Sequence, residues 1–178
     1  MDQPCLQLIE PTARLREDFL ALVEEYVQGG DQRERSTYAE AARDFEAYLG
    51  RLRDHTAGAN MPAGWSPYRT YWLVRDGRRI VATSSLRTVS TEPVLYEIGH
   101  IGYGTRPSER GKGYATAVCR LTLGQAARLG FNRVLITCDA DNVASARIIQ
   151  KNGGVLENQV VSRQTGKLKN RYWIELAP

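Results

Sequence analysis

The chain has 178 residues, 42% of them apolar, and its lysines and arginines exceed its aspartates and glutamates by 24 − 20 = 4. This length and apolar content suit one domain with a sizeable core, so we expect a single domain over residues 1–178. So small a basic excess can attract a phosphorylated cofactor as readily as nucleic acid, and the concentrated basic tracts and stacking motifs that would favour a nucleic-acid partner are missing.

The first part of the chain predicts a short strand and two helices. Residues 5–9 alternate weakly and stop before a proline, which indicates a strand, and Thr12 can cap the helix that follows. Apolar residues then recur at three- and four-residue spacing from Leu15 to Tyr26, before a glycine pair ends the helix. The same spacing predicts a second helix over Tyr38–Leu52.

The middle of the chain predicts a loop followed by strands. Residues 55–69 are rich in glycine, proline and polar residues around Trp65, so we expect a loop at the rim of a pocket, although Trp65 can equally pack on the surface. A hairpin is predicted over residues 70–86, because Asp76-Gly77 is a strong turn signal between two strand patterns. One further strand is predicted over Leu95–Thr105.

The last part alternates helices and strands. A helix beginning near Gly113 is apolar around most of its circumference, so we expect it to be largely buried against the sheet. The predicted elements are a helix ending at Gly130, a strand at 133–138, a helix at 142–151, and a terminal strand pair at 155–163 and 169–176.

Neither a membrane span nor a cysteine framework is predicted. No apolar run approaches the roughly 20 residues that cross a bilayer, and residues 2–4 do not begin a secretory signal, so we expect a cytoplasmic protein with no membrane partner. Three cysteines, scattered and odd in number, predict buried thiols and no disulfide or metal site. They are Cys5, Cys119 and Cys138.

An anion-binding loop is predicted between the strand at 95–105 and the helix that follows it. Gly111 and Gly113 let the backbone approach a ligand closely, and the start of the helix offers unpaired N–H groups and the positive end of its dipole. The spacing fits neither G-x-x-x-x-G-K-[ST] nor G-x-G-x-x-G, which argues against a nucleoside triphosphate or a dinucleotide.

The run Arg110-x-x-Gly113-x-Ala115 resembles the [QR]-x-x-G-x-[GA] acetyl-CoA loop of the GNAT superfamily of N-acetyltransferases. The resemblance is close over residues 95–157 and looser elsewhere, and the branch it looks like is a bacterial group of predicted acetyltransferases. It implies an α/β (α+β) fold with a central mixed, mostly antiparallel sheet, flanking helices and a splayed strand pair for acetyl-CoA. The loop residues implied to hold this co-substrate are Arg110, Gly111, Lys112, Gly113, Tyr114, Ala115 and Thr116.

The resemblance also implies contacts with the pantetheine arm of CoA. In the family this arm lies along the strand before the loop, which maps onto Tyr103, Gly104 and Thr105. Asn142 lies where the family places an asparagine that meets the arm, and Ser145 follows where the next helix can face the cofactor. Asn142 is also an excellent helix N-cap, and the two roles are compatible.

Transfer of an acetyl group to an amine needs a proton acceptor and a proton donor. Many family members carry a tyrosine, seven residues after the asparagine, that protonates the departing thiolate; here the position is Ile149, so water, Ser145 or another tyrosine must replace it. For the base, Glu97 and His100 share the predicted strand on opposite faces, so at most one faces the pocket. We take Glu97 first, with Glu92 and His100 behind it, since a lone histidine on an apolar strand is often a core residue.

The sequence therefore predicts an acetyl-CoA-dependent N-acetyltransferase that moves an acetyl group to a primary amine by direct attack in a ternary complex. Its acceptor is left open between a small polyamine or amino-acid-like amine, an aminoglycoside-type antibiotic, and a protein N-terminus or lysine. A homodimer is compatible with this prediction. The alternative is a non-catalytic acyl-CoA-binding or sensor domain of the same fold, which the missing tyrosine and the undecided base would suit.

Overall fold

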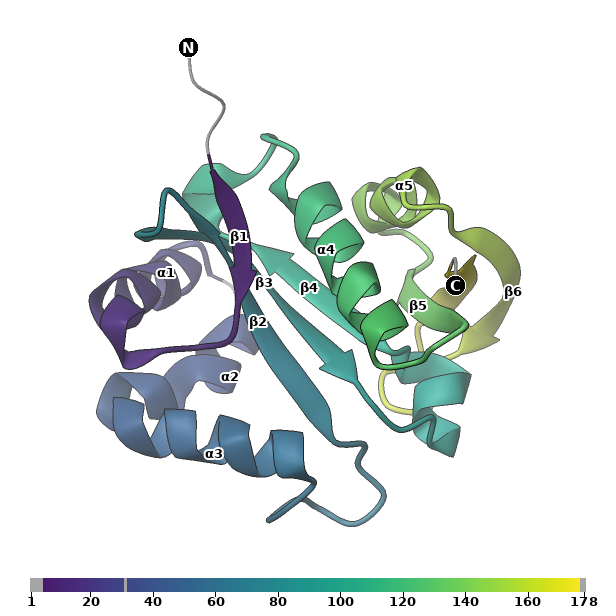
Figure 1. The fold of residues 1–178 in the computed structure, drawn as a ribbon. Coiled ribbons are helices and arrows are strands. Elements are labelled where there is room, and N and C mark those ends of the chain that lie inside the picture. The colour runs from purple at the N-terminus through teal and green to yellow at the C-terminus, as the bar shows by residue number, and fades with distance from the viewer. Residues whose placement is uncertain (1–4, 31, 177–178) are drawn as a thin grey trace.

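The computed structural model describes residues 5–30 and 32–176, where helices flank two antiparallel sheets (Figure 1). Residues 2–4, which entered the expectation about a signal segment, lie outside these ranges. Within them, every helix is too short or too polar to cross a bilayer.

The elements follow one another in a regular order. The N-terminal part consists of β1 (Leu6–Ile9), a 3₁₀ turn (Ala13–Leu15), α1 (Arg16–Gln28), α2 (Gln32–Arg43) and α3 (Phe45–Ala57). Then come β2 (Tyr68–Arg75), β3 (Arg79–Arg87), a π-helical turn (Val94–Ile98), β4 (Ile101–Thr105), α4 (Tyr114–Arg128), β5 (Arg133–Asp139), α5 (Val143–Lys151), β6 (Val155–Val161) and β7 (Leu168–Glu175). The first sheet has the order β1-β2-β3-β4 and the second β5-β7-β6, with antiparallel pairing throughout.

The hairpin of β2 and β3 confirms the turn prediction. Asp76 and Gly77 both have positive φ, 51° and 68°, the backbone conformation that short hairpin turns demand. The pairing then runs from Arg75 opposite Arg79 to Tyr68 opposite Arg87. This hairpin is the centre of the first sheet.

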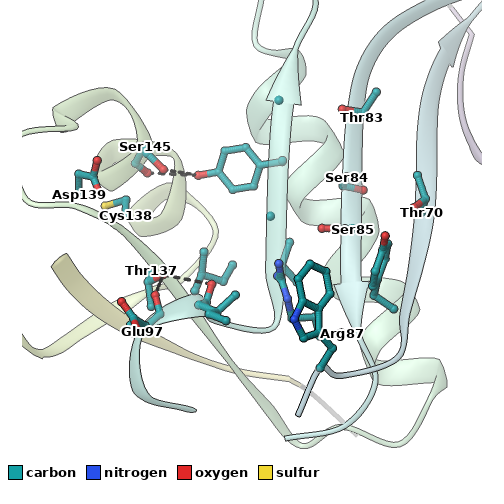
Figure 2. Close-up of a pocket in the computed structure, with 18 of the residues that line it drawn as sticks. Thr70, Thr83, Ser84, Ser85, Arg87, Glu97, Thr137, Cys138, Asp139 and Ser145 are labelled. Carbon is teal, nitrogen blue, oxygen red and sulfur yellow. Dashed lines mark hydrogen bonds between the residues drawn. The ribbon is translucent and has the colours of Figure 1, made fainter. Parts of the chain in front are cut away.

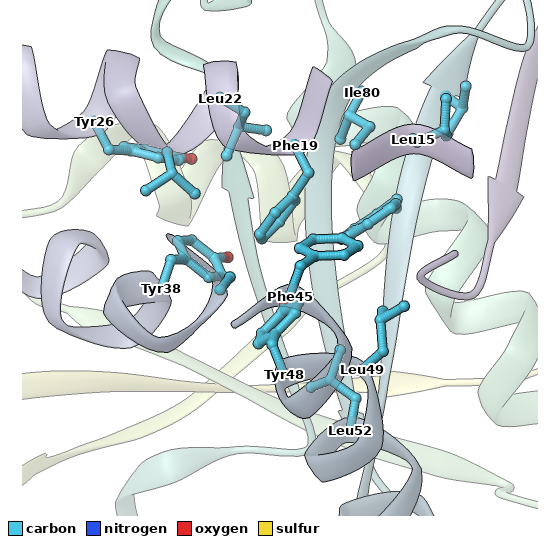
Figure 3. Packing of buried hydrophobic residues seen from close by; sticks show 14 residues of the cluster. Leu15, Phe19, Leu22, Tyr26, Tyr38, Phe45, Tyr48, Leu49, Leu52 and Ile80 are labelled. Atoms are coloured by element: carbon cyan, nitrogen blue, oxygen red, sulfur yellow. The ribbon is translucent and has the colours of Figure 1, made fainter. Parts of the chain in front are cut away.

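Helices cover both faces of the first sheet, α1 to α3 on one side and α4 on the other (Figure 1). The alternation of strand side chains divides them: Trp72 packs under α1–α3, while Leu73 packs under α4. Phe19 of α1 stacks on Trp72 at 4.7 Å and on Tyr48 of α3 at 5.3 Å (Figure 3). Each such aromatic pair adds about 0.5 to 1.5 kcal/mol beyond the area it buries.

The single helix predicted over Tyr38–Leu52 is wrong, because the chain breaks at Asp44. This residue has an extended backbone, and its carboxylate accepts the N–H of Ala47 at 3.0 Å, which makes it the N-cap of α3. The apolar spacing continues across the break, so periodicity alone joined two helices into one.

The strand predicted over Leu95–Thr105 is wrong in its first half, where Val94–Ile98 form the π-helical turn. Gly99 ends this turn at φ 76°, and a Cβ there would lie 3.0 Å from the carbonyl oxygen of Leu135 and 3.1 Å from the amide nitrogen of Thr137. Only glycine lets the chain pass so close to β5. A short apolar run does not distinguish such a buried turn from a strand.

Two expectations about burial hold only in part. One face of α4 is buried, but Arg120, Gly124 and Arg128 on the opposite face are exposed, so the helix is amphipathic and only partly enclosed. Cys119 and Cys138 are buried as predicted, whereas Cys5 is exposed because it precedes β1 at the edge of the sheet.

His100 is a fully buried residue that joins the two sheets. Its backbone N–H donates to the carbonyl of Leu135 at 2.6 Å, and its Nδ1 accepts the Leu135 N–H at 2.9 Å. Its Nε2 lies 2.9 Å from the hydroxyl of Ser90. Burial lowers the pKa of His100, and burial followed by the charge of Arg51 lowers the pKa of His55.

These lowered pKa values predict that stability falls as the pH drops from about 7.5 to 5.5. The unfolded chain protonates its histidines near pH 6.5, whereas the folded chain resists their protonation. The contribution of the two histidines to the free energy of unfolding is therefore complete above that pH and is lost as the pH falls below it. Urea unfolding at the two pH values measures the loss.

The free energy of unfolding should differ less between the two pH values in His55→Gln than in the parent. His100→Gln should reduce this difference in free energy further. The carboxylates of Glu25 and Glu109, whose pKa values are lowered, contribute only at more acid pH. A free energy of unfolding that is the same at both pH values would contradict the prediction.

Candidate active site

A pocket of about 540 Å³ lies where β4 and β5 separate (Figure 2). The two strands belong to different sheets and meet at the His100–Leu135 hydrogen bonds. Beyond that point their described residues form no strand pairing, and Tyr103 and Gly104 on one side face Thr137 and Cys138 on the other across the pocket.

The pocket has two polar walls. On one side, β2 and β3 present hydroxyl groups beside β4, as Figure 2 shows. On the other side, β5 and the start of α5 present a mixed set of polar side chains. The residues of the first wall are Thr70, Thr83 and Ser85, while Ser84 between them turns its hydroxyl to Thr122 of α4, 2.7 Å away; those of the second wall are Thr137, Cys138, Asp139 and Ser145.

Tyr103 spans the gap between β4 and α5. Its hydroxyl lies 2.9 Å from the hydroxyl of Ser145, whose backbone N–H donates to the side chain of Asn142 at 3.0 Å. Burial raises the pKa of Tyr103 well above its ordinary value, by more than the hydrogen bond to Ser145 lowers it, so the phenol stays protonated. The structure thus brings together three predicted residues, and Asn142 caps α5 as well as lining the pocket.

Of the three carboxylate and imidazole candidates for the base, Glu97 alone lies among the pocket residues. It is buried on the π-helical turn, and the hydroxyl of Ser162 donates to its carboxylate at 2.5 Å. Glu92 is exposed and ion-paired with Arg163 at 2.8 Å, while both ring nitrogens of His100 are occupied in the core. The placement of Glu97 comes from the turn and not from the strand alternation that the sequence suggested.

The glycine-rich loop lies beyond the end of β4, outside the pocket lining. Gly113 has φ 83° and precedes α4, and no described side chain caps that helix. No described atom lies within 4 Å of where a Cβ on Gly113 or Gly111 would be. Open space in front of unpaired helical N–H groups is the geometry of an anion site.

The side chains of the loop differ in their partners. The amine of Lys112 donates to Glu109 at 2.9 Å and to the carbonyl of Ser108 at 3.1 Å, so its charge is already paired. Arg110 lies over the ring of Tyr26 at 6.0 Å and is exposed.

The residues on either side of the loop are fixed by hydrogen bonds to α1 and β2. The carbonyl of Thr105, at the end of β4, accepts the hydroxyl of Tyr26 at 3.0 Å. Tyr114 is buried and its hydroxyl accepts from Arg75 at 3.0 Å, while Ala115 and Thr116 are half-buried on the first turn of α4.

Sequence reasoning missed Arg106, which holds the loop to α1. Its guanidinium is 1% exposed and donates to Glu25 at 2.6 Å and to Asp18 at 2.9 Å. Glu25 also accepts the N–H of Ser108, at the base of the loop, and Asp18 accepts the N–H of Ile80. The seven-residue spacing of the two carboxylates on one face of α1 is the only hint in the sequence.

Glu109 is a second buried charge that the sequence did not reveal. Arg75 donates to it at 3.0 Å, and Arg79 lies 3.6 Å away. Burial opposes its ionisation, but the hydrogen bonds of Lys112 and Arg75 outweigh that effect and hold the pKa of Glu109 below its ordinary value. The loop is therefore fixed at its base by paired charges.

The remaining polar groups fit chemistry without a covalent enzyme intermediate. Burial raises the pKa of Cys138, so this pocket thiol stays protonated and is a poor nucleophile. Asp139, which sequence reasoning did not select, lines the pocket with Lys169 3.5 Å away. Across the described ranges, His, Cys, Asp and Glu side chains do not gather in threes that could hold a metal ion.

Ile149 is fully buried, so the position at which a tyrosine would be expected is part of the core. The neighbouring turn packs tightly against it: a Cβ on Gly154 would lie 2.9 Å from the carbonyl oxygen of Ile149 and would also collide with its side chain. In the pocket lining, Ser145 on α5 and Tyr103, whose hydroxyl lies 2.9 Å from that of Ser145, supply hydroxyl groups beside this helix.

Comparison with known proteins agrees with this geometry. Residues 8–155 match the acetyltransferase (GNAT) domain family. No curated protein sequence matches the chain. Among solved structures, similar folds occur in an acetyltransferase of Salmonella typhimurium that modifies the N-terminal serine of ribosomal protein L7/L12 (18% identity, 97% of this chain and 95% of that chain, TM-score 0.67).

Two other solved structures are similar over nearly the whole chain. The microcin C7 self-immunity acetyltransferase MccE, in complex with acetyl-CoA and AMP, shares 15% identity over 96% of this chain and 92% of that chain, with a TM-score of 0.70. RimJ of Mycobacterium smegmatis, in complex with a CoA disulfide, shares 14% identity over 96% of this chain and 81% of that chain, with a TM-score of 0.70. The predicted fold, with mostly antiparallel strands flanked by helices, is confirmed.

The Arg106 ion pairs predict a large stability effect. Arg106→Leu should lower the free energy of unfolding by about 3 to 5 kcal/mol, because it removes the buried guanidinium and leaves two partly buried carboxylates with Arg79 alone, 3.2 Å from Asp18 and 3.4 Å from Glu25. The free energy of unfolding of Arg106→Lys should lie between those of the parent and Arg106→Leu, since an ammonium cannot donate to both carboxylates in the same planar geometry. Guanidinium chloride unfolding measures both changes.

The matched control is Arg16→Leu, which removes an exposed arginine paired with Glu17 on the same helix. That change should cost less than about 1 kcal/mol. If Arg106→Leu proved no more costly than Arg16→Leu, the buried pairs would not be holding the loop.

Proposed function

The chain belongs to the GNAT family of acetyltransferases, and from that premise we propose that it transfers an acetyl group from acetyl-CoA to a primary amine by direct attack in a ternary complex. The observation that carries the proposal is the pocket between β4 and β5, which holds a buried carboxylate, Glu97, together with the protonated Tyr103 and Ser145 hydroxyls. We place the reaction in the cytoplasm.

The residues present fit acetyl-CoA as a substrate. The pyrophosphate would meet the open N–H groups at Gly113, where no described atom fills the position of a Cβ. The pantetheine arm would lie along the edge of β4 that is not paired with β3, reaching Tyr103 and Gly104. Arg110 adds charge at the loop, while the ammonium of Lys112 is directed to Glu109.

Glu97 is proposed as the base that takes the proton from the ammonium of the acceptor. An alkylamine has a pKa near 10.4, so little of it is neutral at pH 7 and a proton must be removed before attack. The hydroxyl of Ser162 fixes one carboxylate oxygen of Glu97 and leaves the other for the amine or for a bridging water.

Tyr103 and Ser145 are proposed to supply the proton that the departing thiolate needs. In one concerted transfer, the hydroxyl of Ser145 can give its proton to the sulfur while Tyr103, which burial keeps protonated, gives its own proton to Ser145, and the phenolate of Tyr103 then regains a proton from solvent. The two hydroxyls take the place of the tyrosine that is absent at Ile149.

The burial of Ile149 also favours a second candidate, a non-catalytic acyl-CoA-binding or sensor domain. Such a protein would bind acetyl-CoA without consuming it. Release of CoA measured against a panel of amines distinguishes the two, since only the enzyme releases CoA in proportion to acetylated product.

The loop assignment predicts that Gly113→Val abolishes CoA binding. Valine at φ 83° is strained, and its side chain would occupy the space in front of the helical N–H groups. Calorimetric titration with CoA measures the loss.

Gly130→Val is the matched control, because Gly130 has φ 85° beyond the opposite end of α4, with no described atom near its Cβ position. It should carry similar strain and keep its CoA affinity. A folded Gly113→Val protein that binds CoA as tightly as the parent would refute the assignment.

The base assignment predicts that Glu97→Gln lowers kcat/KM by about 10² to 10⁴, with little change in CoA affinity. The loss should shrink at high pH, where the amine is deprotonated by solvent. A pH–rate profile for the parent and the variant checks both points, and parallel Tyr103→Phe and Ser145→Ala variants should lower kcat without changing CoA affinity.

Glu92→Gln makes the same chemical change at an exposed carboxylate paired with Arg163, and should leave the profile unaltered. A Glu97→Gln enzyme with the parental pH–rate profile would instead move the role of base to a chain of waters.

A further inference from the structure

Charges at one end of the pocket narrow the class of acceptor. We propose that the acceptor carries an anionic group, a carboxylate or a phosphate, besides the amine that is acetylated, and that Arg51 and Arg87 bind this group. The inference rests on the proposed function and specifies its substrate.

The two arginines come from different layers and reach the same part of the pocket. Arg51 projects from α3, and Arg87 ends β3 opposite Tyr68, the first residue of β2. All three residues line the pocket, as does the exposed Trp65. The sequence expectation that Trp65 belongs to a pocket rim agrees with this position.

Tyr68, which pairs with Arg87 across the hairpin, is the pocket residue on which both arginines act. Burial raises the pKa of Tyr68, while the charges of Arg51 and then Arg87 lower it, so both guanidinium groups act on one phenol. The hydroxyl of Tyr68 lies 2.5 Å from Nδ1 of His55. Since that contact engages the phenol, the two guanidinium groups are the donors that suit a carboxylate or a phosphate.

The carboxylates that line the pocket lie away from Arg87. Glu40 of α2 pairs with Arg51 but does not line the pocket, and Arg87 donates to the carbonyl of Gly99 at 3.2 Å. The pocket carboxylates Glu97 and Asp139 lie on the far side of β4 from Arg87 (Figure 2). Along the pocket lining, the arginines therefore lie beside β2 and β3 and the carboxylates lie beside β5, where Lys169 is 3.5 Å from Asp139.

This separation matches a molecule with charges of both signs. The ammonium would point to Glu97 while its anionic group meets the arginines, with the hydroxyls of the first wall between them. A polyamine or an aminoglycoside would bring additional ammonium groups against Arg51 and Arg87, and like charges at such a site repel. An amino acid, an amino phosphate or a short peptide keeps both interactions.

The test uses acceptors in matched pairs, with acetyl-CoA and the full-length protein. Each amino acid is compared with its amide, O-phosphoethanolamine with ethanolamine, and spermidine represents polycations. We expect kcat/KM for an acid or phosphate to exceed that of its neutral partner by about tenfold to 100-fold, mainly through KM, as charge-assisted hydrogen bonds would give. The amino acid and phosphate pairs show which anion is preferred.

Arg87→Gln and Arg51→Gln should bring these ratios towards one, and Arg87→Lys should restore part of the preference. The matched control is Arg53→Gln, which removes the same charge from an exposed position on α3 outside the pocket lining and should keep the parental ratios.

Two negative outcomes are distinguishable. Equal rates with acids and amides, a preference for spermidine, or ratios unchanged in both arginine variants would overturn this inference while leaving the acetyltransferase proposal in place. Binding of acetyl-CoA without transfer to any amine in the panel would overturn the proposed function and this inference with it.

Discussion

The buried guanidinium of Arg106 is the interaction on which the arrangement of the site depends. It binds two carboxylates of α1 and the carbonyl of Ile80 on β3, so one side chain joins the helical layer, the central hairpin and the base of the loop. Removing such a charge from water is unfavourable, and only complete hydrogen bonding offsets that cost. The same carboxylates hold Ser108 and Ile80 through their backbone N–H groups, which fixes where β4 ends and where α4 can begin.

At the other end of β4 the constraint is steric. Gly99 brings the π-helical turn against β5, and His100 then bonds to both backbone groups of Leu135. These bonds join the two sheets, and the separation of β4 and β5 beyond them creates the pocket. The turn that requires Gly99 also carries Glu97, so the position of the proposed base follows from the same close approach that joins the sheets.

Local chemistry explains what could be predicted from the sequence. The Asp76-Gly77 turn, the glycines of the loop and the capping of α5 by Asn142 depend on a few neighbouring residues, and each was recognised. The break at Asp44 and the π-helical turn were missed because apolar spacing continues through both. The buried pairs of Arg106 join residues about eighty positions apart, and no local pattern announces such a contact. Glu97 was selected for its chemistry, but the alternation used to place it did not apply.

The packing of Ile149 against Gly154 has a consequence for where the hydroxyl groups of this pocket can change. Because a Cβ on Gly154 would lie 2.9 Å from the carbonyl oxygen of residue 149, a backbone atom, the turn after α5 demands glycine whatever side chain stands at 149. The side chain of Ile149 is enclosed by the core, whereas those of Tyr103 and Ser145 reach the pocket. Substitutions that alter the hydroxyl groups of the pocket are therefore tolerated more readily at 103 and 145 than at 149, where a larger side chain would have to be accommodated inside the core.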